Sequence, residues 1–158
     1  MILKGIIDED FVNYKVPSMT LMFPFCDFKC EADGSDYCHN SSLVNEENIE
    51  ISVEDLCERY LNNPISEAIV CQGLEPFDSF NELFSFVITL RNMYDCKDDI
   101  VIYTGYNKDE IGNEVYSLSN YDNIIIKFGR FVPNQKSHYD NVLGVALSSD
   151  NQYAEKIS

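Results

Sequence analysis

The chain has 158 residues, and its 11 basic and 27 acidic side chains give a formal net charge of −16 at pH 7. Hydrophobic residues make up 45% and charged residues 24%, which is typical of a globular protein long enough for one domain with a real core. This negative charge would repel the phosphates of DNA or RNA, so a nucleic-acid-binding function is excluded. Binding to anionic membrane surfaces is disfavoured for the same reason.

The N-terminal segment does not have the pattern of an export signal. Its first ten residues include Lys4, Asp8, Glu9 and Asp10 and contain no long apolar run. No part of the chain approaches the ~18 consecutive apolar residues of a transmembrane helix. We therefore expect a cytoplasmic protein that has neither nucleic acid nor a membrane as a partner.

Strand patterns alternate with helical patterns along the chain. In order, we predict a strand at 18–23, a helix at 52–61, a strand at 67–71, a helix from 78 or 79 to about 93, a strand at 100–104, a helix from 107 to about 118, a strand at 121–128 and a fifth strand at 141–147. Ser52, followed three residues later by Asp55, has the pattern of a capping box. Near-continuous apolar strands separated by helices indicate an α/β fold with a parallel sheet.

Three unusual segments follow predicted strands: a cysteine-rich loop after 18–23, a turn at Gly73 and a turn at Gly105. The carboxyl ends of parallel strands meet at one edge of the sheet, where ligand sites of α/β proteins form. The sequence therefore predicts that these three segments build a single site.

Three of the six cysteines lie within thirteen residues, at Cys26, Cys30 and Cys38. In a reducing cytoplasm such a cluster indicates metal binding or catalysis rather than disulfides. Cys57 falls in a helical pattern and Cys71 in a strand pattern, so we interpret both as small buried hydrophobic residues. Cys96 has no assignment.

Two kinds of metal centre are compatible with the three cysteines. A structural zinc site takes four ligands, and the nearest histidine, His39, adjoins Cys38, so the two side chains point opposite ways in extended backbone. Three thiolates instead suit a 4Fe-4S cluster in which one iron lacks a protein ligand. The amine and carboxylate of S-adenosylmethionine are suited to chelate such an iron. Zinc remains the alternative.

The cysteine loop resembles that of the radical S-adenosylmethionine (radical SAM) superfamily, in which three cysteines are spaced by three and then two residues and an aromatic residue precedes the last. This sequence has CxxxC at 26–30 and YCHN at 37–40. The YCHN ending is similar to that of the activating proteins for anaerobic ribonucleotide reductase. Seven residues, 31–37, stand where the family has two, and we interpret the difference as a five-residue insertion that leaves the ligands in place.

The resemblance covers roughly residues 15–152. QGLEP at 72–76 is similar to the family's GGEP turn, although Gln72 and Leu74 depart from it. YTGY at 103–106, KFGRF at 127–131 and SDNQ at 149–152 resemble segments of the same activating proteins in the same order.

This resemblance implies a single radical SAM domain over residues 1–158, with its core at about 15–152, folded as an open, partial TIM-like barrel of parallel strands with outer helices. It implies a 4Fe-4S cluster on Cys26, Cys30 and Cys38 and S-adenosyl-L-methionine as the second cofactor. No further catalytic residue is predicted.

Five more residues are candidates for cofactor binding, each with a structural alternative. The resemblance places Tyr37 near the adenine, although it could instead cover the cluster, and His39 either hydrogen-bonds near the cluster or is structural. Gly73 either lets the backbone approach the ligand or serves only a turn. Glu75 either holds the methionine end or is a solvated turn acid. Lys127 either contacts the ligand's carboxylate or ribose or lies on the surface.

The activity implied by the resemblance is that of an activase, which generates a glycyl radical on a large partner enzyme. The expected partner is the anaerobic ribonucleotide reductase, with a pyruvate formate-lyase-like enzyme as second choice, and the electron donor is a low-potential protein such as flavodoxin or ferredoxin. One alternative is a radical SAM enzyme that modifies a peptide or small molecule. An alternative of another class is a non-catalytic zinc or iron–sulfur module.

Overall fold

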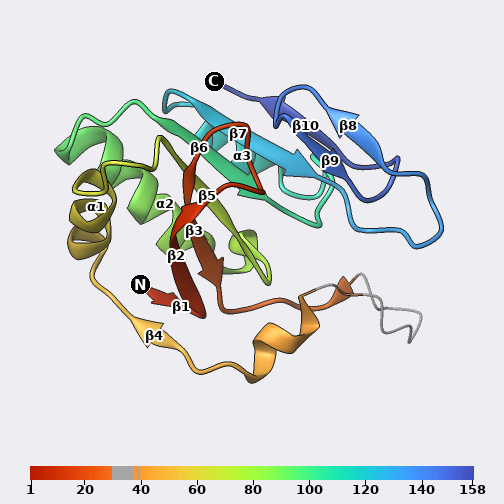
Figure 1. The fold of residues 1–158 in the computed structure, drawn as a ribbon, viewed down its shortest axis with the longest axis horizontal. Helices are drawn as coiled ribbons and strands as arrows, with labels where there is room; N and C mark the ends of the chain where they lie inside the picture. Colours follow the sequence, from red (N-terminus) through yellow and green to blue (C-terminus); the bar gives the residue numbers. More distant parts are fainter. Residues whose placement is uncertain (30–37, 39) are drawn as a thin grey trace.

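The computed structural model describes residues 1–29, 38 and 40–158. Its centre is a six-stranded sheet with the strand order β10-β7-β6-β5-β3-β2 (Figure 1). The strands are β2 (Gly5–Asp10), β3 (Ser18–Phe23), β5 (Ala68–Gly73), β6 (Asp99–Tyr103), β7 (Ile124–Phe128) and β10 (Tyr153–Lys156). The four central strands are parallel, and β2 and β10 pair antiparallel at the two edges.

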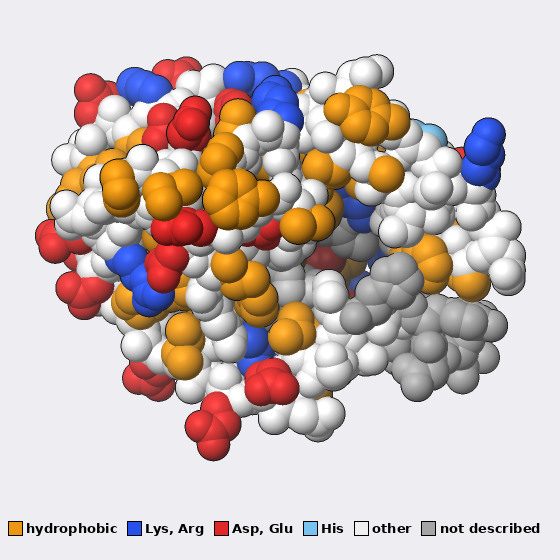
Figure 2. All heavy atoms as spheres, in the orientation of Figure 1, with side chains coloured by type: hydrophobic (Ala, Val, Ile, Leu, Met, Phe, Trp, Pro, Cys, Tyr) orange, Lys and Arg blue, Asp and Glu red, His pale blue; other side chains and the backbone are white. Residues whose placement is uncertain are grey.

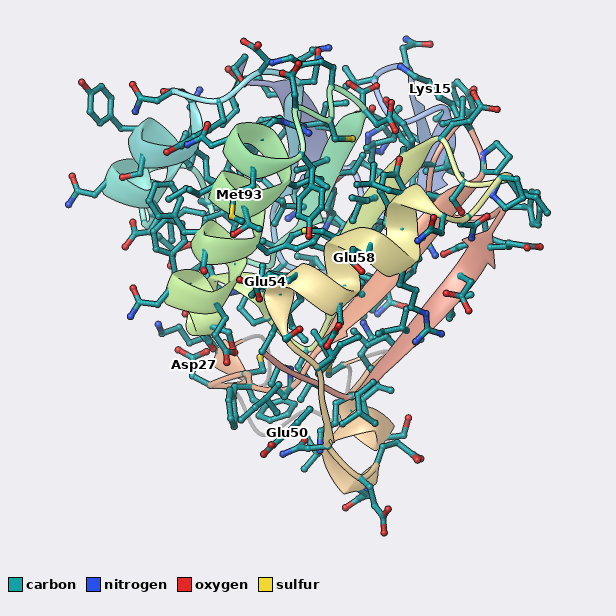
Figure 3. All side chains as sticks on the ribbon, turned by 90° about the vertical axis from the view of Figure 1, so that its left-hand side faces the viewer. Lys15, Asp27, Glu50, Glu54, Glu58 and Met93 are labelled. Atoms are coloured by element: carbon teal, nitrogen blue, oxygen red, sulfur yellow. The ribbon has the colours of Figure 1, made fainter. Side chains whose placement is uncertain are left out.

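Three helices cover one face of this sheet, as Figure 3 shows from the helical side. They are α1 (Val53–Leu61), α2 (Phe80–Ile88) and α3 (Gly112–Leu118). A 3-10 turn, η3 (Pro76–Ser79), precedes α2, and a π-helical turn, η4 (Thr89–Met93), extends it. The smaller elements are a two-stranded pair of β1 (Ile2–Leu3) and β4 (Ile49–Glu50), a 3-10 turn η2 (Ser41–Asn45), and a hairpin of β8 (His138–Asp140) and β9 (Val145–Leu147).

Both faces of the parallel strands are buried, which explains their near-continuous apolar sequences. One set of alternating residues packs against the helices, including Leu21, Ile69 and Ile102. The opposite set, including Val70 and Val101, packs against residues from the segment before β3 and from the β8–β9 hairpin, namely Tyr14, Leu143 and Leu147. The helix-free face is therefore covered by irregular segments and a hairpin, and this is where space for a ligand remains.

The predicted parallel α/β sheet is confirmed, and its TIM-like form is not. The described strands make an open sheet with antiparallel edges, and no closed barrel forms among them. Ser52 is confirmed as the helix cap, because its Oγ accepts the Asp55 N–H at 3.0 Å; the Asp55 carboxylate accepts the Ser52 hydroxyl at 2.6 Å rather than the backbone N–H of a full capping box. Cys57 and Cys71 are fully buried, as expected.

Two boundaries in the prediction are wrong for local reasons. The helix expected from Asn107 starts at Gly112, because residues 107–110 form a turn closed by the Glu110 N–H and the Asn107 carbonyl. The strand expected at 141–147 is largely a turn, because Asp140 Oδ1 accepts backbone N–H groups that a strand would pair. Ser79 stands at the N-cap position of α2, as predicted, but its side chain makes no cap bond, and the hydrogen bonds of Asp78 join other segments.

Acidic side chains are spread over the face in Figure 2 rather than gathered in one patch. Among the described residues, none of the helices combines the length and apolar character needed to cross a bilayer.

Gly73 lies where the parallel strands β3 and β5 end side by side. It pairs with Phe23 and has a φ of 104°, a conformation that residues with a Cβ rarely adopt. A Cβ at this position would lie 2.7 Å from Phe23 N and 2.9 Å from Met22 Cα. Both neighbours are backbone atoms that cannot move aside independently, so only glycine fits.

We predict that Gly73→Ala lowers the free energy of unfolding by at least about 2 kcal/mol, because it adds backbone strain to a steric clash. Gly112→Ala is the matched control. No heavy atom lies within 4 Å of the Cβ it would add in α3, so we expect it to be neutral or to stabilise the chain by about 0.5–1 kcal/mol. Urea unfolding followed by circular dichroism measures both, and equal effects would contradict the prediction.

Candidate functional site

The chain leaving β3 runs directly beside the turn that follows β5. The carbonyl of Phe23 accepts the Leu74 N–H at 3.2 Å, and the carbonyl of Phe25 accepts the Glu75 N–H at 2.8 Å. These two bonds extend the parallel pairing past the end of the sheet. They deliver Cys26, which is partly buried, to the carboxyl edge next to Gly73.

Cys26 begins a tight turn. Phe28 has a positive φ of 53°, and its N–H donates to Cys26 Sγ at 3.2 Å. The N–H of Asp27 donates to Asp78 Oδ2 at 2.9 Å, and the N–H of Lys29 donates to Asp27 Oδ1 at 3.2 Å. Three consecutive backbone N–H groups therefore have defined acceptors, one of which is the cysteine sulfur.

Cys38 lies on the other side of the same edge. Its carbonyl accepts the Ser41 hydroxyl at 3.2 Å, and the neighbouring Asn40 side chain donates to the Gly73 carbonyl at 2.8 Å. Cys26 and Cys38 line one small cavity of about 80 Å³ together with Gly73 and Glu75. The predicted ligand Cys30 and the candidates Tyr37 and His39 lie outside the described residues.

A second cavity, of about 310 Å³, adjoins the first on the helix-free face of the sheet. The two share part of their lining, namely Cys38, Asn40, Gly73, Leu74, Gly105 and Arg130. The larger cavity is also lined by Gln72, Tyr103 and Lys127, which continue the alternation of Val70, Val101 and Ile125. This face of the sheet thus changes from apolar to polar at its carboxyl end. The volume is in the range of small-ligand sites.

Glu75 is buried, with 5% of its surface exposed, so its interpretation as a solvated turn acid is wrong. Its Oε1 accepts the Phe77 N–H at 3.1 Å and its Oε2 accepts the Gly105 N–H at 2.9 Å. The carboxylate therefore ties the turn after β5 to the turn after β6. Burial raises the pKa of Glu75 to about 7, although the hydrogen bonds from Gly105 and Phe77 oppose that effect.

Lys127 is also buried, at 7% exposure, so its interpretation as a surface lysine is wrong. Its ammonium donates to the carbonyls of Gly129 at 2.8 Å and Thr104 at 3.5 Å. Burial lowers the pKa of Lys127 to about 8, and the charge of Glu75 opposes this shift. The side chain therefore places an amine that stays largely protonated at neutral pH in the wall of the larger cavity.

Tyr106 and Asp78 also belong to this edge, although neither was predicted from the sequence to take part in the site. The Tyr106 hydroxyl donates to Asp78 Oδ1 at 2.7 Å, and Asp27 Oδ2 lies 3.3 Å from it. Arg130 stacks over the Tyr106 ring at 5.4 Å and forms a two-pronged ion pair with Glu110 at 2.8 and 2.9 Å. The signal available in the sequence was the position of Tyr106 directly after the strand-end Gly105.

The described residues include thiolates of the kind that an iron–sulfur cluster takes. One group of three potential ligands occurs among them, formed by Cys26, Asp27 and Asp78 with donor atoms within 4.8 Å of one another. Both carboxylates already accept hydrogen bonds within the protein, and Asp27 pairs with Lys29 at 2.6 Å. Among the groups that line the small cavity, Cys26 and Cys38 supply soft thiolates, which iron–sulfur clusters take.

Comparison with known families gives one match. A family model described as a 4Fe-4S single cluster domain matches residues 17–153, a range that contains the three clustered cysteines and the lining of both cavities apart from Val12 and Asn13. This family is found in proteins related to the radical SAM enzymes, and the match supports an iron–sulfur protein. No curated protein matches the chain.

The buried carboxyl of Glu75 predicts a pH dependence of stability. Its ordinary pKa is 4.5 and its pKa in the folded chain is about 7, so between these values the folded chain binds more protons than the unfolded one. Stability must then fall as pH rises through this window, by up to about 3 kcal/mol from this group. We predict that Glu75→Gln, which cannot titrate, removes this part of the fall.

Urea unfolding of the two chains at pH 5 and pH 7 measures the effect. The wild type should lose more stability than Glu75→Gln over this interval. Equal losses in the two chains would show that the carboxyl is not held in a desolvated position.

Proposed function

The chain belongs to the 4Fe-4S single cluster domain family, and on that basis we propose that it is a radical SAM activase for a glycyl radical enzyme. The observation that carries the proposal is the pair of adjoining cavities at the carboxyl edge. The smaller one is lined by two of the clustered cysteines, and the larger one is of ligand size and contains a buried amine. Cys26, Cys30 and Cys38 are the proposed cluster ligands.

A cluster held by Cys26, Cys30 and Cys38 would supply the electron for reductive cleavage of S-adenosylmethionine and, through it, the abstraction of a hydrogen atom from a glycine of the partner. The protein's own groups provide position and exclude water. The proposed role of Lys127 is to pair with an anionic group of the ligand, and that contact would raise its depressed pKa and hold it protonated. The proposed role of Glu75 is structural: it accepts the Gly105 N–H and so holds in place a turn that lines the larger cavity.

Gly73 has two proposed tasks at this site. The absence of a Cβ allows the ends of β3 and β5 to meet. Gly73 also lines both cavities, so that backbone rather than a side chain would face a ligand there. The Gly73 carbonyl accepts a hydrogen bond from the Asn40 side chain. This part of the lining of the larger cavity is therefore preorganised before a ligand binds.

The proposed partner is a large glycyl radical enzyme, with the anaerobic ribonucleotide reductase as first choice and flavodoxin or ferredoxin as electron donor. The larger cavity opens on the helix-free face, where a hairpin and short segments form the cover. A glycine-bearing loop of the partner would complete the enclosure of the radical.

We predict that the chain, reconstituted anaerobically, binds about four irons per molecule. The electron paramagnetic resonance spectrum of the reduced protein should change when S-adenosylmethionine is added, because the ligand occupies the iron without a protein thiolate. Cys38→Ala should lose most of the iron, while Cys96→Ala, a change at a buried cysteine outside the site, should retain it. Binding of zinc alone, or a spectrum indifferent to the ligand, would refute the proposal.

The activase role has a separate test. Mixed anaerobically with an anaerobic ribonucleotide reductase, a reductant and S-adenosylmethionine, the reconstituted chain should generate a glycyl radical doublet on the reductase. Lys127→Met should weaken S-adenosylmethionine binding by about tenfold or more, because it removes a charged hydrogen-bond donor. Cleavage of S-adenosylmethionine without a radical on any glycyl radical enzyme would favour a radical SAM enzyme acting on a peptide or small molecule.

A further inference from the structure

We propose that Asp78 is a positioning residue for Cys26, and that it acts through the backbone of Asp27 with Tyr106 as its second anchor. The inference rests on the proposed role of Cys26 as a cluster ligand. We call these three residues, Asp27, Asp78 and Tyr106, the aspartate clasp.

The two oxygens of Asp78 serve two different segments. Oδ2 accepts the Asp27 N–H at 2.9 Å, and Oδ1 accepts the Tyr106 hydroxyl at 2.7 Å. Asp27 follows β3, Asp78 lies in η3 after β5, and Tyr106 follows β6. One carboxylate therefore joins the exits of three neighbouring strands, at the edge where Figure 3 shows Asp27, opposite the end that carries Lys15.

A local role does not account for this geometry. Asp78 stands just before α2, where an acidic side chain is expected to cap the helix, yet its hydrogen bonds leave the helix for residues 51 and 28 positions away. The ion pair of Asp27 with Lys29 is exposed, and such pairs contribute little. The charge-assisted bonds to Asp78 are also exposed, but they tie the cysteine turn to two other segments, whereas the lysine pair stays within the turn.

The turn that the clasp holds is strained. Phe28 has a φ of 53°, in a left-handed region that disfavours residues other than glycine, and this conformation aims its N–H at Cys26 Sγ. The peptide N–H that Asp78 holds is the one immediately before this strained residue. By fixing the Asp27 N–H, Asp78 keeps Phe28 in place. It thereby maintains both the direction of the Cys26 side chain and the hydrogen bond to its sulfur.

Tyr106 is in turn in contact with two cations. Lys29 Nζ lies 4.9 Å from the centre of its ring and Arg130 lies 5.4 Å from it. Burial and the bond to Asp78 raise the pKa of Tyr106 well above its usual value, so the hydroxyl remains a donor throughout the working pH range. The tyrosine therefore fixes the carboxylate plane of Asp78, which leaves Oδ2 directed at Asp27.

Two substitutions test the clasp, each with a matched control. Asp78→Asn removes the charge and one of the two acceptors, and Asp95→Asn makes the same change at a carboxylate that is 86% exposed. Tyr106→Phe removes only the hydroxyl, and Tyr116→Phe makes the same change on α3 at a tyrosine that is 74% exposed. Equal urea midpoints in each variant and its control confirm that the fold is intact.

We expect the reconstituted Asp78→Asn and Tyr106→Phe proteins to release iron to a chelator about fivefold faster than their controls, because a charge-assisted hydrogen bond at the cysteine turn is lost. The midpoint potential of Tyr106→Phe should also fall, since a looser N–H···S bond favours the reduced cluster less. If the carboxylate of Asp78 acted through its charge alone, Tyr106→Phe would match its control in both measurements, and that result would overturn the proposal.

A measurement on the cluster-free chain separates this inference from the proposed function. Alkylation by iodoacetamide, mapped by peptide mass spectrometry, should be about threefold faster at Cys26 in both variants and unchanged at the buried Cys57. If the wild type held no cluster, the proposed function would fail while this measurement still tested the clasp. Unchanged alkylation at Cys26 together with unchanged iron release would overturn the clasp and leave the proposed function intact.

Discussion

The backbones of β3 and β5 approach each other so closely at Phe23 and Gly73 that no methyl group fits between them. This contact is the constraint on which the rest of the site depends. It brings Phe25 within hydrogen-bond distance of Glu75 N, and the cysteine turn begins one residue later. Because the β3 exit and the β5 exit are fixed together, every residue that follows Gly73 takes its position relative to the cysteines from this contact.

Two buried charges extend the same constraint across the sheet. Glu75 ties the β5 exit to the Gly105 turn after β6, and Lys127 near the end of β7 donates to the Thr104 carbonyl after β6 as well as to the Gly129 carbonyl. Each charge loses hydration, and the shifts in their pKa values show that the backbone bonds do not fully replace it. A protein that needed stability alone would gain by placing apolar residues here. The site therefore retains polar groups at a cost in stability, as functional sites commonly do.

Much of the fold followed from the sequence because burial on both faces leaves a clear pattern. The apolar runs ending at Phe23, Cys71, Thr104 and Phe128 predicted the four parallel strands almost at their observed positions. The edge strands β2 and β10 were missed, since they have one exposed side and carry acidic residues that resemble loops. The helix at Gly112 was predicted too early because Asn107 has the chemistry of a cap but starts a turn.

The candidate-site residues that stand in short sequence motifs could be predicted, and those that depend on contacts between distant parts of the chain could not. Cys26, Cys38, Gly73 and Lys127 were found because each stands in a short motif or at a strand end. Asp78 was not, since its two partners are 51 and 28 residues away and no local pattern joins them. Glu75 was recognised as a candidate, but the ties from its carboxylate to the backbone depend on a contact that only the folded chain makes.

The net charge of the chain and the cations near the cysteines act in opposite directions on a reduced cluster. A net charge of −16 disfavours the addition of an electron, although salt screens exposed charges beyond ~10 Å. Close to Cys26, the carboxylates of Asp27 and Asp78 disfavour the electron as well. Lys29, Arg130 and the Phe28 N–H favour it. Because distance decides between these effects, the potential of a cluster held here would be governed by the geometry of a few residues around Cys26 more than by the acidity of the protein. The hydrogen bonds that hold this turn in place are therefore as much a part of the proposed chemistry as the thiolates themselves.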